Sequence, residues 1–178
     1  MSKALLFSGG VESTYLYLSM MEEPIDLYVI ERDNCSSEHI FDFYEALSTM
    51  FGYEHTIKLL KYPDIENYKK VIYALRELSP QYDEVIFGYN KEPEELERND
   101  IFVRMWDDIP NVKTPLEFMN KAEVIRKYYE EGIEDILPFT ITCGVKGKAP
   151  CGECYPCKER ELAYEKLDLP VNLGKSYL

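Results

Sequence analysis

The sequence predicts an α/β fold built on a doubly wound parallel sheet. Short strand-like runs, at 5–7, 25–30, 55–60 and 83–90, alternate with longer segments whose apolar residues recur at helical spacing. Such regular alternation is typical of parallel sheets with helices on both faces. The first two runs and the helix between them therefore predict a βαβ unit, which is right-handed almost without exception.

Length and composition predict a single globular domain. The chain has 178 residues, 46% of them hydrophobic, which is enough to bury a core. We therefore expect residues 1–178 to form one domain. No apolar run approaches the length of a membrane span, and Met1-Ser2-Lys3 leads into a strand without the features of a secretory signal. The expected location is the cytoplasm, with no membrane partner.

The formal net charge of −13 argues against broad, sequence-independent binding of DNA or RNA. That mode of binding depends on neutralising phosphates with Lys and Arg. A small anionic ligand is still compatible with this charge, because backbone amides, Mg²⁺ and a few well-placed cations can hold it locally. A homo-oligomer is also compatible with the sequence.

The first predicted strand ends in a glycine corner. Gly9 and Gly10 let the backbone approach a ligand closely, and the free N–H groups at the start of the following helix attract anions. Hydroxyl donors flank the corner at Ser8, Ser13 and Thr14. The stretch is predicted to cradle a pyrophosphate. The alternative is a plain strand-turn-helix corner that binds nothing.

The middle of the chain continues the alternation. The predicted strands are 25–30, 55–60 and 83–90, and the predicted helices are 11–21, a helix from Ser36 or Ser37 to Phe51, and 65–78. Gly52 is expected to close the second helix. Gly88 and Asn90 end the strand at 83–90, at the carboxyl edge where open α/β sheets bind ligands. Cys35 stands alone in a polar loop, and we interpret it as a passive thiol.

The pattern is looser after this strand. Residues 91–111 are acidic around a few apolar side chains, which favours a helix with one apolar side over a dedicated site. A brief extended segment at 112–116 follows. Asn120 and Glu123 have the spacing of a capping box and predict a helix to Glu131 that ends at Gly132. The last predicted helix covers about 157–167.

Four of the five cysteines lie within fifteen residues, at Cys143, Cys151, Cys154 and Cys157. Thiols this dense are not expected to form disulfides in a reducing cytosol, and the C-x-x-C spacings favour tetrahedral Zn²⁺. Four protein ligands close the coordination shell, so this zinc is predicted to be structural. We expect residues 143–160 to form a zinc-binding loop and the start of the last helix. A redox pair and an iron–sulfur cluster are the alternatives.

Two family resemblances follow from these motifs. The stretch from Ser8 to Ser13 resembles the Ser-Gly-Gly-x-Asp-Ser signature of the PP-loop ATP pyrophosphatases, which have an adenine nucleotide alpha hydrolase-like, Rossmann-like fold. Together with Pro115-Leu116, the pair Lys121 and Glu123, and the segment from Cys151 to Arg160, it resembles the 7-cyano-7-deazaguanine synthase family. That family makes the precursor of queuosine and archaeosine (preQ0).

The resemblance implies a set of site residues and ligands. ATP would be bound by Phe7, Ser8, Gly9, Gly10, Val11, Glu12, Ser13 and Thr14, and zinc by Cys143, Cys151, Cys154 and Cys157. Glu12, Lys121 and Arg160 are the implied catalytic residues. The implied partners are small molecules: ATP with Mg²⁺, 7-carboxy-7-deazaguanine and ammonia. The implied reaction is the ATP-dependent conversion of that carboxylate to 7-cyano-7-deazaguanine, a carbon–nitrogen ligase reaction.

Two departures from the family pattern keep other functions open. Glu12 stands where the superfamily carries aspartate, and the region from Lys91 to Asp108 lacks the Tyr-Pro-Asp-Cys-Arg run of the family. One alternative is a PP-loop enzyme that adenylates another acceptor. A second is a zinc- and nucleotide-binding protein without catalysis. A thiolation enzyme is less favoured, because the thiols are expected to bind zinc.

Overall fold

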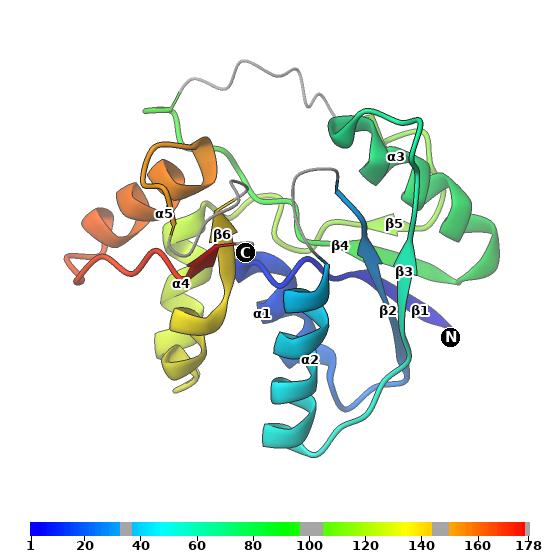
Figure 1. Ribbon diagram of the computed structural model, residues 1–178, viewed down its shortest axis with the longest axis horizontal. Coiled ribbons are helices and arrows are strands. Elements are labelled where there is room, and N and C mark those ends of the chain that lie inside the picture. The colour runs from blue at the N-terminus through cyan, green and yellow to red at the C-terminus, as the bar shows by residue number, and fades with distance from the viewer. Residues whose placement is uncertain (33–36, 97–104, 144–149, 177–178) are drawn as a thin grey trace.

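Five parallel strands form the central sheet in the order β3-β2-β1-β4-β5 (Figure 1). The structure is a computed structural model that describes residues 1–32, 37–96, 105–143 and 150–176. The strands are β1 (Lys3–Leu6), β2 (Ile25–Ile30), β3 (Ile57–Leu60), β4 (Glu84–Phe87) and β5 (Val112–Lys113). This parallel order confirms the predicted α/β fold class.

β1 lies in the middle of the sheet and is covered on both faces. Leu5 is aligned with Leu27 of β2 on one side and with Ile86 of β4 on the other. Along β1, Leu5 belongs to the larger apolar cluster and the adjacent Leu6 to the smaller one. A strand buried on both faces requires an uninterrupted apolar sequence, which explains the run at the start of the chain.

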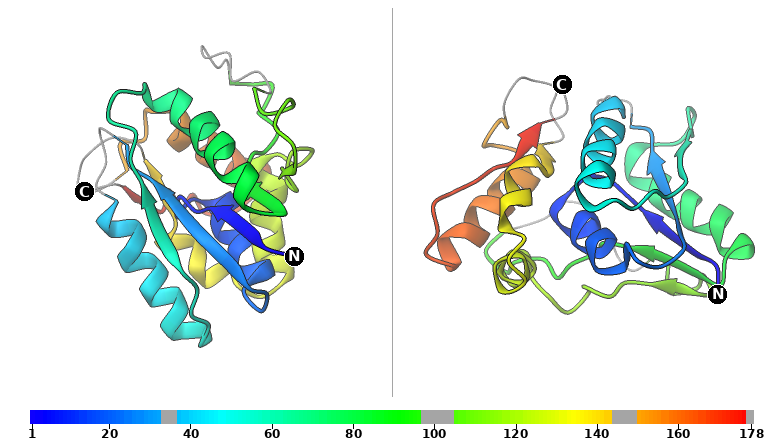
Figure 2. Two further views of the ribbon diagram at one scale, coloured as in Figure 1. Left: turned by 90° about the vertical axis from the view of Figure 1, so that its right-hand side faces the viewer. Right: turned by 90° about the horizontal axis from the view of Figure 1, so that it is seen from below.

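Helices cover both faces of the sheet, as Figure 2 shows. α1 (Val11–Met20) and α2 (Glu38–Phe51) pack on one face, where they contribute Leu16, Tyr17 and Leu47 to the larger cluster. α3 (Asn67–Leu78) covers the other face. Gly52 ends α2 in the left-handed conformation with φ of 76°, as its position in the sequence predicts.

α4 (Lys121–Glu130) and α5 (Tyr155–Lys166) pack against each other beside the sheet (Figure 1). The capping box of α4 is present: the Glu123 N–H donates to Asn120 Oδ1 at 3.0 Å, and the Asn120 N–H donates to Glu123 Oε2 at 2.7 Å. α5 begins at Tyr155, earlier than predicted, because Pro156 fits the first helical turn.

Several features were not predicted. They are the 3₁₀ helices η1 (Ser79–Gln81) and η2 (Glu134–Phe139), and a second sheet of β6 (Ile141–Cys143) and β7 (Lys175–Ser176). The predicted helix over 91–111 is absent from the parts of that region that the structure describes, 91–96 and 105–111. The lone thiol Cys35, the alternative cap Ser36 and residues 144–149 of the predicted zinc loop lie outside the described residues. No described helix combines the length and apolar character needed to span a bilayer.

Candidate functional site

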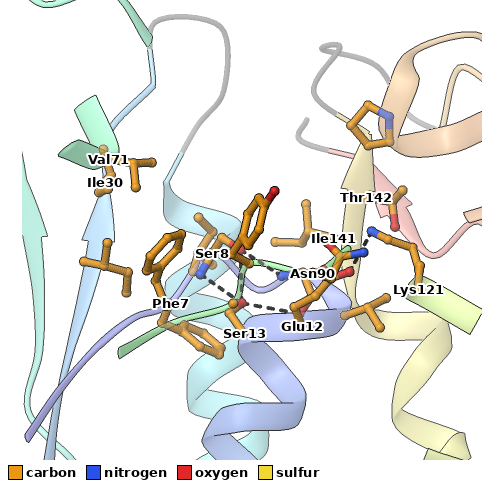
Figure 3. Close-up of a pocket in the computed structure, with 18 of the residues that line it drawn as sticks. Phe7, Ser8, Glu12, Ser13, Ile30, Val71, Asn90, Lys121, Ile141 and Thr142 are labelled. Carbon is orange, nitrogen blue, oxygen red and sulfur yellow. Dashed lines mark hydrogen bonds and ion pairs between the residues drawn. The ribbon is translucent and has the colours of Figure 1, made fainter. Parts of the chain in front are cut away.

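A cavity of about 300 Å³ opens at the carboxyl edge of the sheet. Its walls come from the ends of β1, β2 and β4, from the starts of α1, α4 and α5, and from β6. Figure 3 shows the side chains that line it. This is the edge where open α/β folds bind their ligands, at the point where the strand order reverses on either side of β1.

The glycine corner forms the floor of this cavity. Gly9 has a φ of 69°, which favours glycine, and Gly10 is the N-cap of α1. The Ser8 and Ser13 hydroxyl oxygens lie 3.0 Å apart, and the Ser8 N–H donates to Ser13 Oγ at 3.1 Å. Six of the eight predicted ATP-binding residues line the cavity, namely Phe7, Ser8, Gly10, Val11, Glu12 and Ser13. The other two, Gly9 and Thr14, are not in its lining.

Gly88 allows the corner and β4 to approach each other. A β-carbon on Gly88 would lie 2.7 Å from Glu12 Cβ and 3.0 Å from the Ser13 nitrogen. We expect Gly88→Ala to displace the start of α1 and to lower the free energy of unfolding by about 1–3 kcal/mol. Urea denaturation measures this loss.

The matched control is Gly132→Ala, because Gly132 has a φ of 68° and a β-carbon added to it would meet no atom within 4 Å. That change is expected to cost about 1–2 kcal/mol through backbone strain alone, without moving the corner. Wild-type stability in Gly88→Ala would contradict the packing argument.

A buried ionic cluster closes one end of the cavity. Lys121 Nζ lies 2.9 Å from Glu12 Oε1 and 2.9 Å from Glu159 Oε2. Asn90 Nδ2 donates to Glu159 Oε1 at 3.1 Å. The exposed fractions of Glu12, Lys121 and Glu159 are only 9%, 8% and 6%. Figure 3 shows Asn90, Lys121 and Thr142 gathered at this end.

The two carboxylates keep Lys121 charged. Burial alone lowers the pKa of Lys121, but the charges of Glu12 and Glu159 and the hydrogen bonds to them raise it above the ordinary value for lysine. Removing one member of a buried ionic cluster leaves an uncompensated charge and is costly. The cluster therefore holds a cation beside the glycine corner.

Sequence reasoning found Glu12 and Lys121 but missed Glu159. The signal was available: Glu159 lies one helical turn before Ala163 and two residues after Cys157, both of which are buried. A carboxylate on the buried face of a predicted helix indicates a partner cation. Asn90 was placed correctly at the carboxyl edge of the sheet, although no partner was predicted for it.

The opposite end of the cavity is apolar. Phe7, Ile30 and Val71 line it and lie away from the ionic cluster in Figure 3. Phe7 also stacks on Phe43 of α2, with ring centroids 6.4 Å apart and an interplanar angle of 17°. One end of the cavity therefore suits a flat apolar group and the other suits charge.

Arg160 lies outside the lining of the cavity. Its side chain is fully buried, and the guanidinium donates to the Leu137 carbonyl at 2.7 Å, to Thr140 Oγ1 at 2.7 Å and to the Asn172 carbonyl at 2.5 Å. These bonds join α5 to η2 and to the segment before β7. The structure does not bring Arg160 together with Glu12 and Lys121 in the cavity.

The four clustered cysteines converge. The sulfurs of Cys143, Cys151, Cys154 and Cys157 all lie within 4.8 Å of one another. Four sulfurs around one tetrahedral zinc ion lie about 3.8 Å apart, given Zn–S distances of about 2.3 Å. The Cys151 N–H also points to Cys143 Sγ at 3.4 Å, and the Cys154 N–H to Cys151 Sγ at 3.3 Å. The cluster can therefore hold a metal ion, and its all-sulfur ligand set fits zinc.

The four-cysteine cluster and the cavity share two secondary-structure elements, β6 and α5. Cys143 ends β6, directly after Thr142 in the cavity wall, and Cys157 lies in the first turn of α5 together with Tyr155 and Pro156 of the same wall. A metal ion held here fixes the relative positions of β6 and α5. It would therefore fix one wall of the cavity.

Two of the four thiols, Cys151 and Cys157, have pKa values shifted in opposite directions. The pKa of Cys151 is lowered to about 6 by the backbone N–H groups of Cys154 and Glu153, whereas burial raises that of Cys157. In metal-free protein at pH 7, a short iodoacetamide pulse is expected to alkylate Cys151 first, because it is mostly thiolate there. The preference for alkylating Cys151 should decrease at pH 5, because that pH is below the pKa of Cys151 and most of the thiol is then protonated.

Mass spectrometry of peptides measures this order of labelling. Added zinc is the control and is expected to protect all four thiols. Equal labelling of Cys151 and Cys157 at pH 7 would contradict the assignment.

Part of the chain is similar to one known protein family. Residues 89–168 match the family model described as queuosine biosynthesis protein QueC. The 7-cyano-7-deazaguanine synthases of Clostridium novyi (strain NT) and Clostridium botulinum (strain 657 / Type Ba4) are 45% and 43% identical to this chain over 56 residues. The matched segment covers 30% of this chain and 25% of each relative.

A solved structure is similar along most of the chain. It is the crystal structure of a predicted subunit of tRNA methyltransferase from Methanocaldococcus jannaschii DSM, with a TM-score of 0.49 and 15% identity. The superposition covers 98% of this chain and 92% of that one. The family match confirms the resemblance expected from the sequence motifs over residues 89–168, which are similar to QueC; the glycine corner at residues 8–13 lies outside the matched segment.

Proposed function

We propose that the chain binds ATP with Mg²⁺ in the cavity and uses it to convert 7-carboxy-7-deazaguanine and ammonia to 7-cyano-7-deazaguanine. The observation that carries this proposal is the meeting of a glycine corner and a buried lysine in one cavity. Lys121 lies 2.9 Å from Glu12, which belongs to the first turn of the helix after the corner. The names of the QueC-like relatives support the choice of reaction.

The cavity offers a place for each part of the nucleotide. The start of α1 belongs to the floor of the cavity, and the N–H groups of a helix start attract phosphates. The apolar end beside Phe7, Ile30 and Val71 accepts the adenine ring. Lys121 offers a fixed positive charge at the polar end. Positioning and electrostatic stabilisation of this kind are the main contributions that a protein makes to transfer at phosphorus.

The proposed chemistry has two adenylation steps. An oxygen of the substrate carboxylate attacks the α-phosphorus of ATP and pyrophosphate leaves. Ammonia then displaces AMP and gives the amide. The amide oxygen attacks the α-phosphorus of a second ATP and pyrophosphate leaves again; loss of AMP, which carries away the amide oxygen, and of both amide protons gives the nitrile. No covalent bond to a side chain is required. The Glu12 carboxylate would help to bind Mg²⁺. The cysteine cluster would hold zinc as a purely structural ion.

We also propose that residues 1–178 act as one domain, with 143–160 as its zinc-binding segment. Tyr128 of α4 supports this, because its buried hydroxyl donates to the Val11 carbonyl at 2.7 Å. This bond ties α4 to the glycine corner. Arg160 would then act on the fold around α5 instead of on the substrate.

The test is a direct assay of the purified protein. ATP, Mg²⁺, ammonium and 7-carboxy-7-deazaguanine are supplied, and AMP, pyrophosphate and the nitrile are measured by liquid chromatography and mass spectrometry. The expected result is nitrile formation with two AMP per product. Omission of ammonium is the control and is expected to stop nitrile formation. Absence of both AMP and nitrile, under conditions in which a known synthase is active, would refute the proposal.

A second candidate is a protein that binds nucleotide without turning it over. The observation that favours it is the pairing of Glu12 with Lys121, since a carboxylate so engaged is less available to Mg²⁺. In that case calorimetry should detect ATP binding while no acceptor yields AMP. Recovery of AMP formation in Glu12→Asp would support this candidate, and turnover by the unaltered protein would exclude it.

A further inference from the structure

Lys121 forms ion pairs with two carboxylates that differ in their other contacts. Glu12 and Glu159 both lie 2.9 Å from its ammonium nitrogen. Two carboxylates and one ammonium give the cluster a net charge of about −1, in a region where each side chain is almost fully buried. One carboxylate is therefore in excess of what Lys121 alone requires.

Glu159 is the better anchored of the two. Its second oxygen accepts a hydrogen bond from Asn90 at 3.1 Å. The backbone beside Asn90 is tied to the start of α4, because the Lys91 N–H donates to the Met119 carbonyl at 2.8 Å and Lys91 forms a parallel bridge with Asn120. Glu159, Asn90 and Lys121 are thus held together by contacts that do not involve the Glu12 carboxylate.

Glu12 has no comparable second anchor. Among the described residues, its carboxylate has Lys121 as its one ion-pair partner. Its other oxygen faces the corner, since a β-carbon placed on Gly10 would lie 3.9 Å from Glu12 Oε2. A carboxylate at this place repels the phosphates of a nucleotide unless a cation lies between them.

We propose that Glu159 is the positioning residue for Lys121: it holds the ammonium in place when Glu12 turns from Lys121 to the Mg²⁺ of a bound nucleotide. The proposal rests on the proposed nucleotide site. Glu12 and Glu159 then have different roles. Glu12 is the exchangeable partner, and Glu159 with Asn90 is the permanent one. Without Glu159, Lys121 would lose its last carboxylate at the moment at which its position matters.

Side-chain NMR of ¹⁵N-lysine tests this division directly. A buried, paired ammonium exchanges its protons slowly, and Lys121→Met identifies the Lys121 signal and separates it from that of the buried Lys70. In the unaltered protein, saturation with the magnesium complex of a non-hydrolysable ATP analogue is expected to change the exchange rate of Lys121 by less than about threefold. In Glu159→Gln, the same addition should accelerate exchange at least tenfold.

Three further variants sharpen the comparison. Glu12→Gln should keep a protected Lys121 with and without the analogue. Asn90→Ala retains Glu159 but removes its second anchor, so it should give an intermediate acceleration. Glu165→Gln removes an exposed carboxylate of the same helix and should behave as the unaltered protein. Thermal melts confirm that each variant is folded, and Asn90→Ala carries the test if Glu159→Gln is not.

Kinetics supply a second readout that a purely structural role would not move. Glu159→Gln is expected to lower kcat about tenfold or more while the KM for ATP stays within about threefold, and Glu159→Asp should recover part of kcat. Adding Glu159→Gln to Lys121→Met should cause no further loss, because residues that act as a unit are not additive. Additive losses would overturn the positioning role.

The failure of this proposal differs from the failure of the proposed function. Calorimetry that detects the analogue, with Lys121 still protected in Glu159→Gln, would overturn the positioning role alone. Loss of protection in the unaltered protein on binding would do the same. Calorimetry without binding would refute the proposed function. Whether Glu159 anchors Lys121 is then tested in the protein without nucleotide. There, Glu159→Gln must accelerate proton exchange of the Lys121 ammonium more than Glu12→Gln does, and the reverse order would overturn the positioning role.

Discussion

Cys157→Ser is expected to abolish metal binding by the four-cysteine cluster and to lower Tm by more than about 10 °C. Cys157 is fully buried in the first turn of α5, and α5 packs along α4. Structural zinc sites contribute roughly 10 kcal/mol in small metal-dependent folds. Losing about half of that energy would lower Tm by about 10 °C or more, because each kcal/mol of unfolding free energy changes Tm by about 2–4 °C in a chain of this size.

Metal content by atomic absorption and a thermal melt measure this result together. Cys35→Ser is the matched control, because Cys35 is the one cysteine of the sequence outside the four-cysteine cluster, and this variant is expected to keep one metal ion per chain. AMP formation should fall with metal content in Cys157→Ser, since β6 and α5 both carry part of the cavity wall. Stoichiometric zinc with an unchanged Tm in Cys157→Ser would refute the assignment of the ligands.

Lys121→Met should have the second largest effect. It leaves Glu12 and Glu159 buried together without their cation. Breaking a buried ion pair from one side costs about 3–5 kcal/mol of unfolding free energy. We also expect AMP formation to fall more than a hundredfold, because the fixed charge at the polar end of the cavity is lost.

Urea denaturation and the AMP assay separate these two effects. The double variant Lys121→Met with Glu159→Gln removes one of the stranded charges and should recover part of the stability but none of the activity. Lys127→Met is the control on the same helix, because Lys127 is half-exposed and, among the residues that the structure describes, forms its ion pair with Glu130, three residues further along. Wild-type stability in Lys121→Met would contradict this expectation, because it would show that Glu12 and Glu159 can be buried together without the lysine charge.

Local patterns in the sequence predicted most of the sheet and its helices. The boundaries of β2 at 25–30, the end of α2 at Gly52 and the capping box of Asn120 all depend on a few adjacent residues, and all three are present. The cysteine cluster was predictable for the same reason. Thiol spacing along the chain limits which sulfurs can meet around one ion.

The features that were missed depend on residues far apart in the sequence. Glu159 is useful only because Lys121 and Asn90 reach it from α4 and from the end of β4. The Arg160 side chain similarly finds its partners in η2, in Thr140 and in the segment before β7. Its position in a motif indicated importance, and the packing shows which groups its guanidinium contacts, among them Thr142 of the cavity wall. β6 and β7 pair across more than thirty residues, and neither is long enough to give a periodic pattern.

One backbone contact links the two halves of the site. The Ile141 N–H donates to the Gly9 carbonyl at 2.7 Å, which joins the strand that carries Cys143 to the turn beneath the proposed nucleotide. Energetic coupling between two binding sites is reciprocal. If occupancy of the thiolate cluster tightens the hold on nucleotide by some factor, nucleotide must tighten the hold on zinc by the same factor. The protein would then surrender its metal to a chelator most readily when ATP is scarce.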